Sequence, residues 1–447
     1  MTSALNTPSG WKELRLDEAC EVILGQSPPG DTYNSAGNGL PFFQGKAEFG
    51  EMYPTPRKWC SSPGKLAEPE NILISVRAPV GPTNLCPSKA CIGRGLAAIR
   101  PRDGMPSRYF LYAIRATVDA LVDQATGSTF EAVSGADLKA HIVPVAPPPM
   151  QPVIVAEIEK QFTRLDAGIA ALRNVQAKLK RYRAAVLKAA SEGRLVPNEA
   201  DTFKKFESGR DLLARIKTAQ TATAEPRKRP APNHHNNPNL LSLPAGWTWA
   251  GMREVGNVQL GRQRAPQHHN GDHMRPYLRV ANVFEARIDT SDVKEMNFTP
   301  DEFLKYRLQA GDILLNEGQT PELVGRPAMF KDEIPGCCYQ KTLLRFRAHP
   351  GVLPNFALTV FRAYMHSGRF KRSASITTNI AHLTAEKFVE IEFPLPPLAE
   401  QKRIVAEVER RLSVVEELEA VVSAILQRAS RLRQSILQKV FAGELVD

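Results

Sequence analysis

The sequence predicts an α+β fold in which two mixed α/β domains are joined by two long antiparallel coiled-coil helices, with a pseudo-two-fold internal repeat. Three observations support this prediction. Short segments of the first half recur in the second half, each copy ends in a long heptad pattern, and the body before each heptad pattern alternates short apolar runs with Gly and Pro. A chain of 447 residues has room for this arrangement, at roughly 100–200 residues per domain.

The repeat is clearest at the two ends of each copy. Residues 8–11 (PSGW) recur as 244–247 (PAGW), an offset of 244 − 8 = 236. The Gln and the Ile-Val-Ala-Glu run of 151–157 recur in 401–407, an offset of 401 − 151 = 250 that holds to the end of each copy. We therefore predict five segments: a domain at 1–150, a long helix at 151–196, a linker with a short helix at 197–243, a second domain at 244–400 and a second long helix at 401–447.

Each tail predicts a helix of the coiled-coil type. Prolines precede both tails, at 147–149 and 396–397, where a missing N–H is tolerated at a helix start. Apolar residues then recur every seven positions, which is typical of a coiled-coil seam: Ile158, Leu165, Leu172, Leu179 and Val186 in one tail, and Val408, Val415, Val422, Ala429 and Ile436 in the other, with a second row at Leu418, Ile425 and Leu432. Gly193 and Gly443 stand where a left-handed C-terminal cap is expected.

The two bodies show the shorter periods of a mixed domain. Apolar, β-rich runs predict strands at 71–76, 96–99, 277–283, 313–315 and 343–346, and helical patterns occur at 108–122 and 355–366. Between the copies, 211–219 predicts one short helix. The stretch 221–239, rich in Pro, Ala, Asn and basic residues, predicts an exposed linker.

Composition narrows the class of protein. The chain has 58 Lys and Arg against 47 Asp and Glu, a net charge of +11, which favours a polyanionic partner such as nucleic acid. Six cysteines without Cys-x-x-Cys spacing are too few for a disulfide scaffold and argue against structural zinc, so we expect a reducing cytoplasm. No signal-peptide pattern opens the sequence, and no run approaches 18 apolar residues, so we expect no membrane span.

Motifs for catalysis are missing. Neither Gly-Lys pair, at 45–46 and 64–65, completes a phosphate-binding loop. No Pro pair follows Asn or Asp, as an adenine-amino methyltransferase motif requires. Acid-x-Lys spacings occur at 137–139, 292–294 and 400–402 without the upstream Pro-Asp of many metal-dependent nucleases, and the His run at 268–273 lies in loop-like sequence. We therefore predict a non-catalytic chain with no metal site.

Several phrases carry a family resemblance, namely 71–81 (NILISVRAPVG), 91–98 (CIGRGLAA), 311–315 (GDILL), 393–405 (FPLPPLAEQKRIV), 432–437 (LRQSIL) and 443–446 (GELV). At these residues the chain resembles the specificity subunit of type I restriction-modification systems, over nearly its whole length. The segment 149–153 departs from the family by lacking the Glu-Gln-Lys-Arg spelling of its counterpart. The resemblance implies two target-recognition domains that bind double-stranded DNA at a bipartite, asymmetric sequence.

The resemblance also implies the partners. Two modification subunits would bind S-adenosylmethionine and methylate adenine, and restriction subunits would use ATP and Mg²⁺ to translocate and cut DNA. No cofactor is then expected on this chain, which would act in the cytoplasm as a non-catalytic subunit of the endodeoxyribonuclease and methyltransferase complex.

We predict that polar residues in turns flanking the strands contact DNA, because Arg, Lys, Gln and Asn read base edges and Ser and Thr add phosphate contacts. The candidates in the first body are Gln44, Lys46, Arg77, Arg94 and Thr129. Those in the second body are Arg279, Asn282, Asn316, Gln319, Arg326, Lys341 and Thr378. For any single residue, a solvated loop charge or a turn-stabilising group is as good an explanation.

Three alternatives remain open from the sequence. The main one is a stand-alone regulator that binds a bipartite DNA site without partner subunits. A self-contained restriction or methylation enzyme is disfavoured by the missing motifs. A scaffold whose coiled coil binds only protein would show weak salt dependence of any DNA binding.

Overall fold

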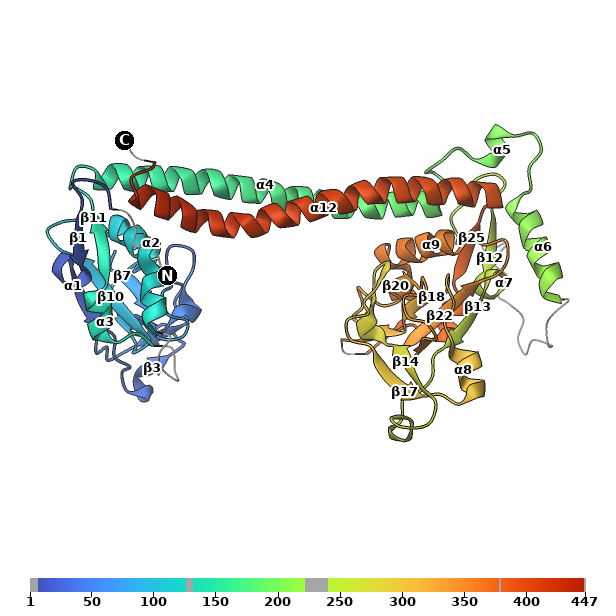
Figure 1. Ribbon diagram of the computed structural model, residues 1–447, viewed down its shortest axis with the longest axis horizontal. Helices are drawn as coiled ribbons and strands as arrows, with labels where there is room; N and C mark the ends of the chain where they lie inside the picture. The colour runs from blue at the N-terminus through green and yellow to red at the C-terminus, as the bar shows by residue number, and fades with distance from the viewer. Residues whose placement is uncertain (1–6, 126–131, 222–239, 378, 446–447) are drawn as a thin grey trace. The chain divides into compact units, whose positions relative to one another are not determined.

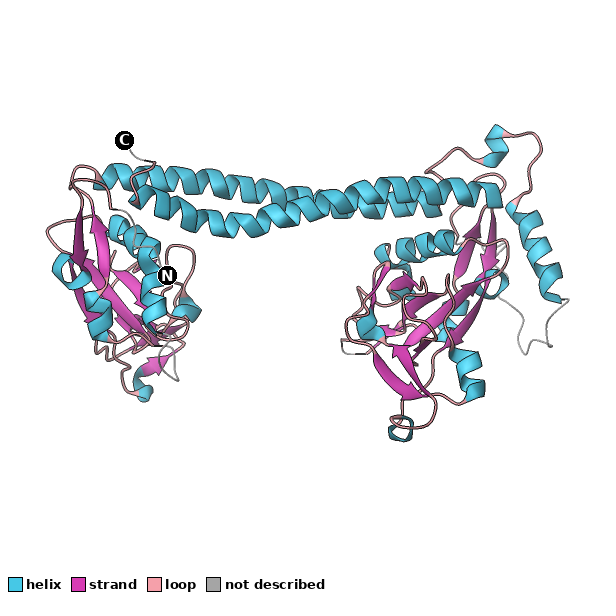
Figure 2. Cartoon of the chain, viewed as in Figure 1, coloured by secondary structure: helices cyan, strands magenta, loops and turns pink. Residues whose placement is uncertain are grey.

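The computed structural model of the chain describes residues 7–125, 132–221, 240–377 and 379–445 (Figure 1). The chain forms two compact units: unit 1 contains Met1–Asn174 and Val422–Asp447, and unit 2 contains Val175–Val421. Each unit therefore combines one body with parts of both long helices, α4 (Gln151–Ser191) and α12 (Leu398–Phe441). Figure 2 distinguishes the helices from the strands of both bodies.

The body of unit 1 is built on an antiparallel four-stranded sheet in the order β2-β10-β7-β8. A five-stranded sheet in the order β3-β5-β4-β9-β6 adjoins it, and β4 and β9 run parallel. A third sheet pairs β1 with β11. The strands are β1 (Lys12–Arg15), β2 (Cys20–Leu24), β3 (Tyr33–Asn34), β4 (Leu40–Phe43), β5 (Lys58–Cys60), β6 (Leu66–Ala67), β7 (Ile72–Ser75), β8 (Thr83–Leu85), β9 (Ala90–Ile92), β10 (Leu96–Pro101) and β11 (Ile142–Val145).

Helix α2 (Ser107–Ala125) packs onto the four-stranded sheet of unit 1. Its residues Tyr109, Phe110 and Ile114 share one apolar core with Ile72 and Ile74 of β7. Leu73 of the same strand points to the opposite face and is buried in a second core with Leu96 and Ala98, so both faces of β7 are covered. The remaining short helices of this body are α1 (Leu16–Ala19), α3 (Gly135–Ala140), η1 (Gly30–Thr32) and η2 (Lys46–Glu48).

Unit 2 repeats this plan. Its antiparallel four-stranded sheet has the order β13-β22-β18-β20, and β14 pairs in parallel with β21 in a neighbouring sheet. The strands are β12 (Thr248–Gly251), β13 (Gly256–Leu260), β14 (Met274–Leu278), β15 (Val283–Phe284), β16 (Arg287–Ile288), β17 (Lys294–Asn297), β18 (Ile313–Asn316), β19 (Gly318–Gln319), β20 (Pro327–Met329), β21 (Cys338–Tyr339), β22 (Leu343–Ala348), β23 (Ser375–Ile376), β24 (Ala381–His382) and β25 (Glu392–Leu395).

The helices of unit 2 include the element that leads to its body from α4. They are α5 (Glu199–Thr202), α6 (Gly209–Thr221), α7 (Met252–Val255), α8 (Pro300–Tyr306), α9 (Pro354–His366), α10 (Arg369–Ser373), α11 (Ala385–Val389), η3 (Pro266–His268) and η4 (Val280–Asn282). The predicted helices at 108–122, 211–219 and 355–366 are confirmed as α2, α6 and α9. Of the predicted linker, residues 222–239 lie outside the described part of the chain.

Strand register confirms the internal repeat residue by residue. In unit 1, β1 pairs with β11 so that Lys12 faces Val145. In unit 2, β12 pairs with β25 so that Thr248 faces Leu395. The partners are 248 − 12 = 236 and 395 − 145 = 250 residues apart, which are the two offsets read from the sequence.

Within each unit the two long helices pack as an antiparallel pair. In unit 1, Ile154 and Ile158 of α4 share a core with Leu437 and Val440 of α12, although the first pair begins one helix and the second ends the other. In unit 2, the end of α4 packs with the start of α12 in the same way, through Val186, Leu187, Ile404 and Val408. The predicted coiled coil is thus confirmed, and Gly193 and Gly443 have the positive φ of C-terminal caps, 67° and 78°.

One detail of the predicted seam is wrong. The first heptad row of α12 is buried, with Val415 at 1% exposure and Val422 at 5%. The second row is not part of the seam, because Leu418, Ile425 and Leu432 are 46%, 40% and 48% exposed. A single partner helix covers only one face, and the sequence period alone does not tell which of two adjacent rows faces it.

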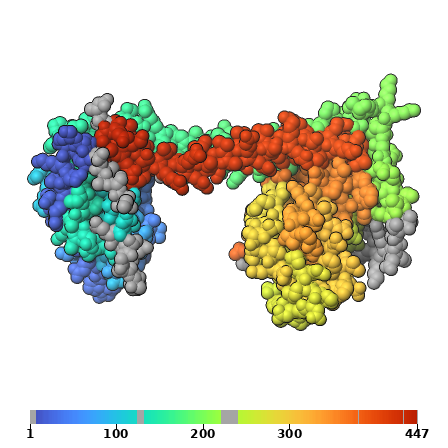
Figure 3. Space-filling model, viewed as in Figure 1, coloured from blue at the N-terminus to red at the C-terminus, as the bar shows by residue number. Residues whose placement is uncertain are grey.

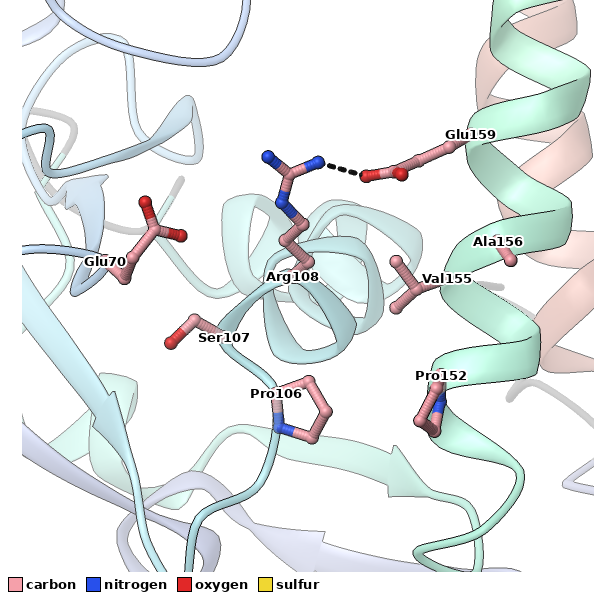
Figure 4. A pocket seen from close by; sticks show the side chains of 8 residues that line it. All are labelled: Glu70, Pro106, Ser107, Arg108, Pro152, Val155, Ala156 and Glu159. Atoms are coloured by element: carbon pink, nitrogen blue, oxygen red, sulfur yellow. Dashed lines mark hydrogen bonds and ion pairs between the residues drawn. The ribbon is translucent and has the colours of Figure 1, made fainter.

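A shallow groove marks the junction of body and long helix in unit 1 (Figure 4). Pro106 and Arg108, at the start of α2, lie opposite Val155 and Ala156 of α4, and Ser107 lines the groove on the side of Glu70. Arg108 donates a hydrogen bond of 2.5 Å to Glu159, and this ion pair links the body to the long helix. In unit 2 the same positions carry Asn355 and Glu409, joined at 2.9 Å, so the repeat keeps the contact while its charge changes.

Candidate nucleic-acid interface

Four loops of unit 1 are joined by backbone hydrogen bonds into one surface, which we call loop cluster 1: residues 25–27, 43–46, 76–77 and 93–95. The amide of Gly93 donates to Phe43 O at 2.8 Å, and the amide of Val76 donates to Gly95 O at 3.0 Å. The amide of Gln26 donates to Ile92 O at 3.0 Å. Because the bonds use main-chain atoms, the side chains that point out of the cluster are free to differ in chemistry.

Loop cluster 1 brings four of the five predicted residues of the first body together. Gln44 follows β4 and is half-buried, Lys46 and Arg94 are exposed, and Arg77 is exposed after β7. A Cβ on Gly95 would lie 2.3 Å from Gln44 O, so only glycine allows the loop of Arg94 to approach the loop of Gln44 this closely. Thr129, the fifth residue, lies outside the described residues.

The structure also places Ser27 beside Arg94. The Arg94 amide donates to Ser27 Oγ at 3.5 Å, a long contact that positions the loop, while the guanidinium stays exposed. Ser75 holds the other loop, because its hydroxyl donates to Arg77 O at 3.0 Å. Ser27 was not among the predicted residues. Its signal was the Gly25-Gln26-Ser27 turn after β2, at the repeat position of Gly261 and Arg262.

Unit 2 builds an equivalent surface, loop cluster 2, from residues 261–262, 278–282, 317–319 and 340–342. The amide of Glu317 donates to Thr342 O at 3.0 Å, and the amide of Gln340 donates to Leu278 O at 2.9 Å. Parallel pairing sets the equivalence, because Phe42 faces Cys91 in unit 1 and Tyr277 faces Cys338 in unit 2. Counting from these pairs, Gln44 corresponds to Arg279, and Arg94 corresponds to Lys341.

The equivalent positions therefore carry different side chains on the same backbone frame. A glutamine in unit 1 stands where unit 2 has Arg279, and an arginine stands where unit 2 has the exposed Lys341. Arg279 is half-buried and forms an ion pair with Asp292. The pKa of Asp292 is lowered by hydrogen bonds from Lys294 and from Arg279, so this carboxylate stays charged and holds the arginine against the loop.

Asn282 has a role inside the loop. Its side chain is 2% exposed, its Oδ1 accepts the Arg279 amide at 3.1 Å, and its Nδ2 donates to Asp289 O at 2.9 Å and to Asp292 O at 3.0 Å. All of these bonds go to backbone atoms. Asn282 thus shapes the loop that carries Arg279, and the prediction that it contacts DNA is not tested by this geometry.

The last three described candidates line the strand end at β18 and β19. Asn316 is fully buried, and neither its amide nitrogen nor its oxygen has a hydrogen-bond partner among the described residues. Gln319 is half-buried, and its Oε1 accepts the Thr320 amide at 3.0 Å. Arg326 is half-buried, and burial lowers the pKa of its guanidinium. Thr378 lies outside the described residues.

Arg326 takes part in a cation–π site around Phe284 that was not predicted from the sequence. The guanidinium of Arg326 and that of Arg287 each lie 4.8 Å from the ring centroid of Phe284, which is 36% exposed. Such cation–π contacts hold both cations beside an exposed ring, and Arg287 is also paired with Asp289 at 3.8 Å. Phe284 leaves no periodic signal in the sequence, because it stands alone next to the turn of the hairpin β15-β16.

The described residues contain no cluster of three or more His, Cys, Asp or Glu that is able to hold a metal ion. The six cysteines are all buried, and burial raises the pKa of Cys20, Cys86, Cys337 and Cys338 to about 12, which leaves them as thiols. Among the helices that the structure describes, none has the length and apolar content needed to cross a bilayer. The chemistry of both clusters is that of polar and cationic binding surfaces.

Comparison with known proteins places these features in a family. The family described as type I restriction modification DNA specificity domain matches residues 8–181 and 246–419, one match for each copy of the repeat. A provisionally named type I restriction enzyme MjaX specificity subunit of Methanocaldococcus jannaschii is 39% identical over 155 residues, which is 34% of this chain and 36% of that protein. The aligned part thus spans about a third of that relative.

Two further comparisons cover nearly the whole chain. The type I restriction enzyme EcoKI specificity subunit of Escherichia coli is 22% identical over 411 residues, 90% of this chain and 80% of that protein. The crystal structure of the HsdS subunit of Thermoanaerobacter tengcongensis matches with a TM-score of 0.56 at 18% identity, covering 98% of both chains, and so shares the fold. With two family domains, two equivalent loop clusters and paired long helices, the chain belongs to the family of type I restriction-modification specificity subunits and is a non-catalytic, DNA sequence-recognising subunit.

Proposed function

We propose that this subunit reads a bipartite, asymmetric DNA target, one half-site with each loop cluster. The target-recognition domains would be residues 1–150 and 244–400. The observation that carries the proposal is the equivalence of the two clusters, whose loops are joined by matching backbone bonds while their outward side chains differ. Two similar surfaces with different polar groups favour two half-sites of different sequence.

The exposure of four cations in the two clusters supports this assignment. Lys46, Arg77 and Arg94 are exposed in cluster 1, and Lys341 is exposed in cluster 2, where guanidinium and ammonium groups can reach phosphates or the acceptor edges of guanine. The excess of basic residues over the chain adds a non-specific, salt-dependent attraction to DNA.

The proposed partners are two modification subunits and, for restriction, translocase and nuclease subunits. S-adenosylmethionine, ATP and Mg²⁺ would be bound by those partners, which supply adenine methylation and DNA cleavage. The internal repeat supports two copies of a partner, because Gln151 and the Ile-Val-Ala-Glu run of the first tail recur in the second. This subunit would direct where both activities occur.

The test is an exchange of one body. A chimaera in which residues 8–150 come from a relative should be expressed with its modification subunit in a host without adenine methylation, and its methylated motif read by sequencing. We expect one half of the motif to change and the other to stay. A motif changed in both halves would contradict the assignment of one half-site to each cluster.

A second measurement separates this proposal from a stand-alone regulator. Gel-shift titrations of the purified chain on its own methylated motif should be run with and without the modification subunit. We expect specific binding to require, or to be strongly tightened by, the modification subunit. Equal specific affinity in both titrations would favour the regulator.

A further inference from the structure

The two units differ in what covers one shared surface. In unit 2, the segment from α5 to α6 lies against the sheet β12-β25, and the space-filling view shows it seated on the side of that body (Figure 3). The Gly209 amide donates to Gly246 O at 2.7 Å. A Cβ on Gly246 would lie 2.8 Å from the Phe206 ring, and one on Gly351 would lie 3.0 Å from Leu212 Cδ1.

Helix α6 is held by an apolar side and by one charge. Leu212, Leu213 and Ile216 are all buried in the core of unit 2. Lys217, the next residue along, forms an ion pair with Glu254 at 2.7 Å, and Glu254 is 9% exposed. This is the contact pattern of an amphipathic helix with a cation at the edge of its apolar stripe.

Unit 1 presents the same surface without such a cover. We call it the β1-β11 face. Gly10 and Gly104, the repeat equivalents of Gly246 and Gly351, have nothing within 4 Å of an added Cβ among the described residues. The equivalent of Glu254 is Glu18, which caps the same short helix by accepting the Arg15 amide at 3.0 Å.

Residues of the β1-β11 face are more exposed in unit 1 than their equivalents are in unit 2. Glu18 is exposed where Glu254 is buried, and it forms no ion pair within the described part of the chain. Apolar residues of the face are less buried as well: Trp11, Leu14 and Met105 are half-buried, whereas their equivalents Trp247, Ala250 and Val352 are buried. The fold therefore leaves partly exposed apolar groups and one carboxylate where its second copy seats a helix.

We propose that the β1-β11 face of unit 1 is the docking site for an amphipathic helix of a partner subunit, which covers it as α6 covers unit 2. The expected helix has Leu or Ile at positions i, i+1 and i+4 and a Lys or Arg at i+5, the pattern of Leu212, Leu213, Ile216 and Lys217. The inference rests on the proposed function only in naming the owner of the helix as a partner subunit.

Charge argues for a protein helix over nucleic acid at this face. Asp17 is already paired with Arg15 at 3.0 Å, so the exposed Glu18 is the carboxylate left for a partner, and a phosphate group placed against it would meet repulsion. A helix with a cation at its edge would instead pair with Glu18, as Lys217 pairs with Glu254.

The face can be probed with a helix of known sequence. A fluorescein-labelled peptide of residues 208–221, which contains α6, is titrated with the full-length chain, and its anisotropy is followed. We expect saturable binding that weakens at least tenfold with the double variant E18Q/M105E. Gln at position 18 keeps an oxygen for the Arg15 amide, which separates loss of charge from loss of the cap.

Two controls fix the location of the probe. The first is E254Q, the matched change in unit 2, which should leave peptide binding unchanged. The second is a K217E peptide, which should bind the parent chain more weakly than the unchanged peptide does. With the E18Q chain, the K217E peptide and the unchanged peptide should bind equally well. Absence of binding, or loss with E254Q instead of E18Q/M105E, would overturn the assignment of the face.

Hydrogen exchange identifies the natural occupant. Exchange of residues 11–19 and 102–106 is compared in the full chain alone, with its modification subunit, and with a DNA duplex. Protection of these residues in the subunit complex, lost in E18Q/M105E, supports the proposal. Protection that depends on chain concentration alone, or on DNA alone, would assign the face to a second copy or to nucleic acid and would overturn it. The peptide titration needs neither partner nor DNA, so its result is independent of the proposed function.

Discussion

A glutamine stands at the equivalent position near the start of each long helix, and its hydrogen bonds differ between the two units. Gln401 is fully buried, and its Oε1 accepts the Leu353 amide at 2.8 Å while its Nε2 donates to Gly351 O at 3.1 Å and Pro396 O at 3.2 Å. Gln151 keeps the bond from Nε2 to Ala146 O, at 2.9 Å, but its buried Oε1 has no partner among the described residues. The position equivalent to Leu353 is Pro106, which has no amide hydrogen to give.

The residues just before these glutamines, Glu400 and Met150, also differ, and again unit 2 has the larger number of hydrogen bonds. Glu400 is fully buried in unit 2, where it accepts the Glu199 amide at 3.0 Å and the Trp247 indole N–H at 2.8 Å. Its equivalent in unit 1 is Met150, which brings no acceptor. At these two positions the repeat thus preserves the backbone path, while unit 2 has more side-chain hydrogen bonds than unit 1. The same substitution made at equivalent positions of the two units should therefore change the stability of the chain by different amounts.

The largest difference is expected at Gly95, where two loops of cluster 1 approach each other closely. Gly95→Val places side-chain atoms where even a Cβ lies 2.3 Å from Gln44 O, so the loops of cluster 1 must separate, at a cost of about 3 kcal/mol in the free energy of unfolding. The equivalent residue is Thr342, whose buried hydroxyl has no partner in the described residues, so Thr342→Val should be neutral or stabilising. Urea unfolding of both variants checks this, and equal destabilisation would contradict the matched geometry.

Next come the exposed cations at equivalent positions. Arg94→Ala and Lys341→Ala should each weaken specific DNA binding by roughly 1–3 kcal/mol if they contact bases, and should relax only the half-site of their own unit. Sequencing the methylated motif of each variant, together with binding titrations at two salt concentrations, distinguishes base contact from phosphate contact. If a variant keeps both its methylated motif and its affinity for DNA, the replaced residue is a solvated loop charge and not a DNA contact.

The two glutamines give a smaller contrast. Gln401→Leu removes the acceptor of a buried amide and the donor to two carbonyls, and we expect a loss of about 2 kcal/mol in unfolding free energy. Gln151→Leu removes only one donor and also removes an unpaired buried oxygen, so its loss should be about 1 kcal/mol or less. Thermal or urea denaturation of the two variants provides the measurement, and a costlier Gln151→Leu would show that the orphan oxygen has a partner in solution.

The smallest effect concerns pH. Burial raises the pKa of Glu400 above its usual value, although the Glu199 amide and the Trp247 indole oppose the shift. A raised pKa in the folded state means that the folded chain binds this proton more readily, so its contribution to stability falls as pH rises from the unfolded pKa, near 4.3, to the folded one. Glu400→Gln should flatten this part of the stability profile between pH 4 and neutrality. An unchanged slope in urea titrations would place the titrating group elsewhere.

Much of this architecture could be predicted because helices and strands leave regular spacings of apolar residues in the sequence. The heptads predicted two long helices, which the structure has at Gln151–Ser191 and Leu398–Phe441. The buried strand at 313–315 and the capping glycines also leave a local signal, and both were confirmed. The second apolar row at Leu418, Ile425 and Leu432 was misplaced, because a period does not reveal which face a partner covers.

The candidate site was predictable in position more than in role. Turn residues that follow buried strands, such as Gln44 and Arg94, do gather in one cluster, since strand ends of one sheet meet. No pattern distinguishes Asn282, which holds its own loop, from a residue that points outward, because both are polar residues in a turn. Phe284 was missed for the opposite reason: a single exposed aromatic carries no period at all.

The six buried thiols have a practical consequence for fluorescence work. Maleimide dyes react with the thiolate, and burial raises the pKa of Cys91 to about 11 and that of four other cysteines to about 12, so native labelling should be slow. A single cysteine introduced at an exposed position beside a cluster, Ala47 in one unit or Thr320 in the other, would then carry one dye without removal of any native cysteine or of a proposed DNA contact. Such a pair of singly labelled chains would report, in real time, which half of a DNA target each surface meets first.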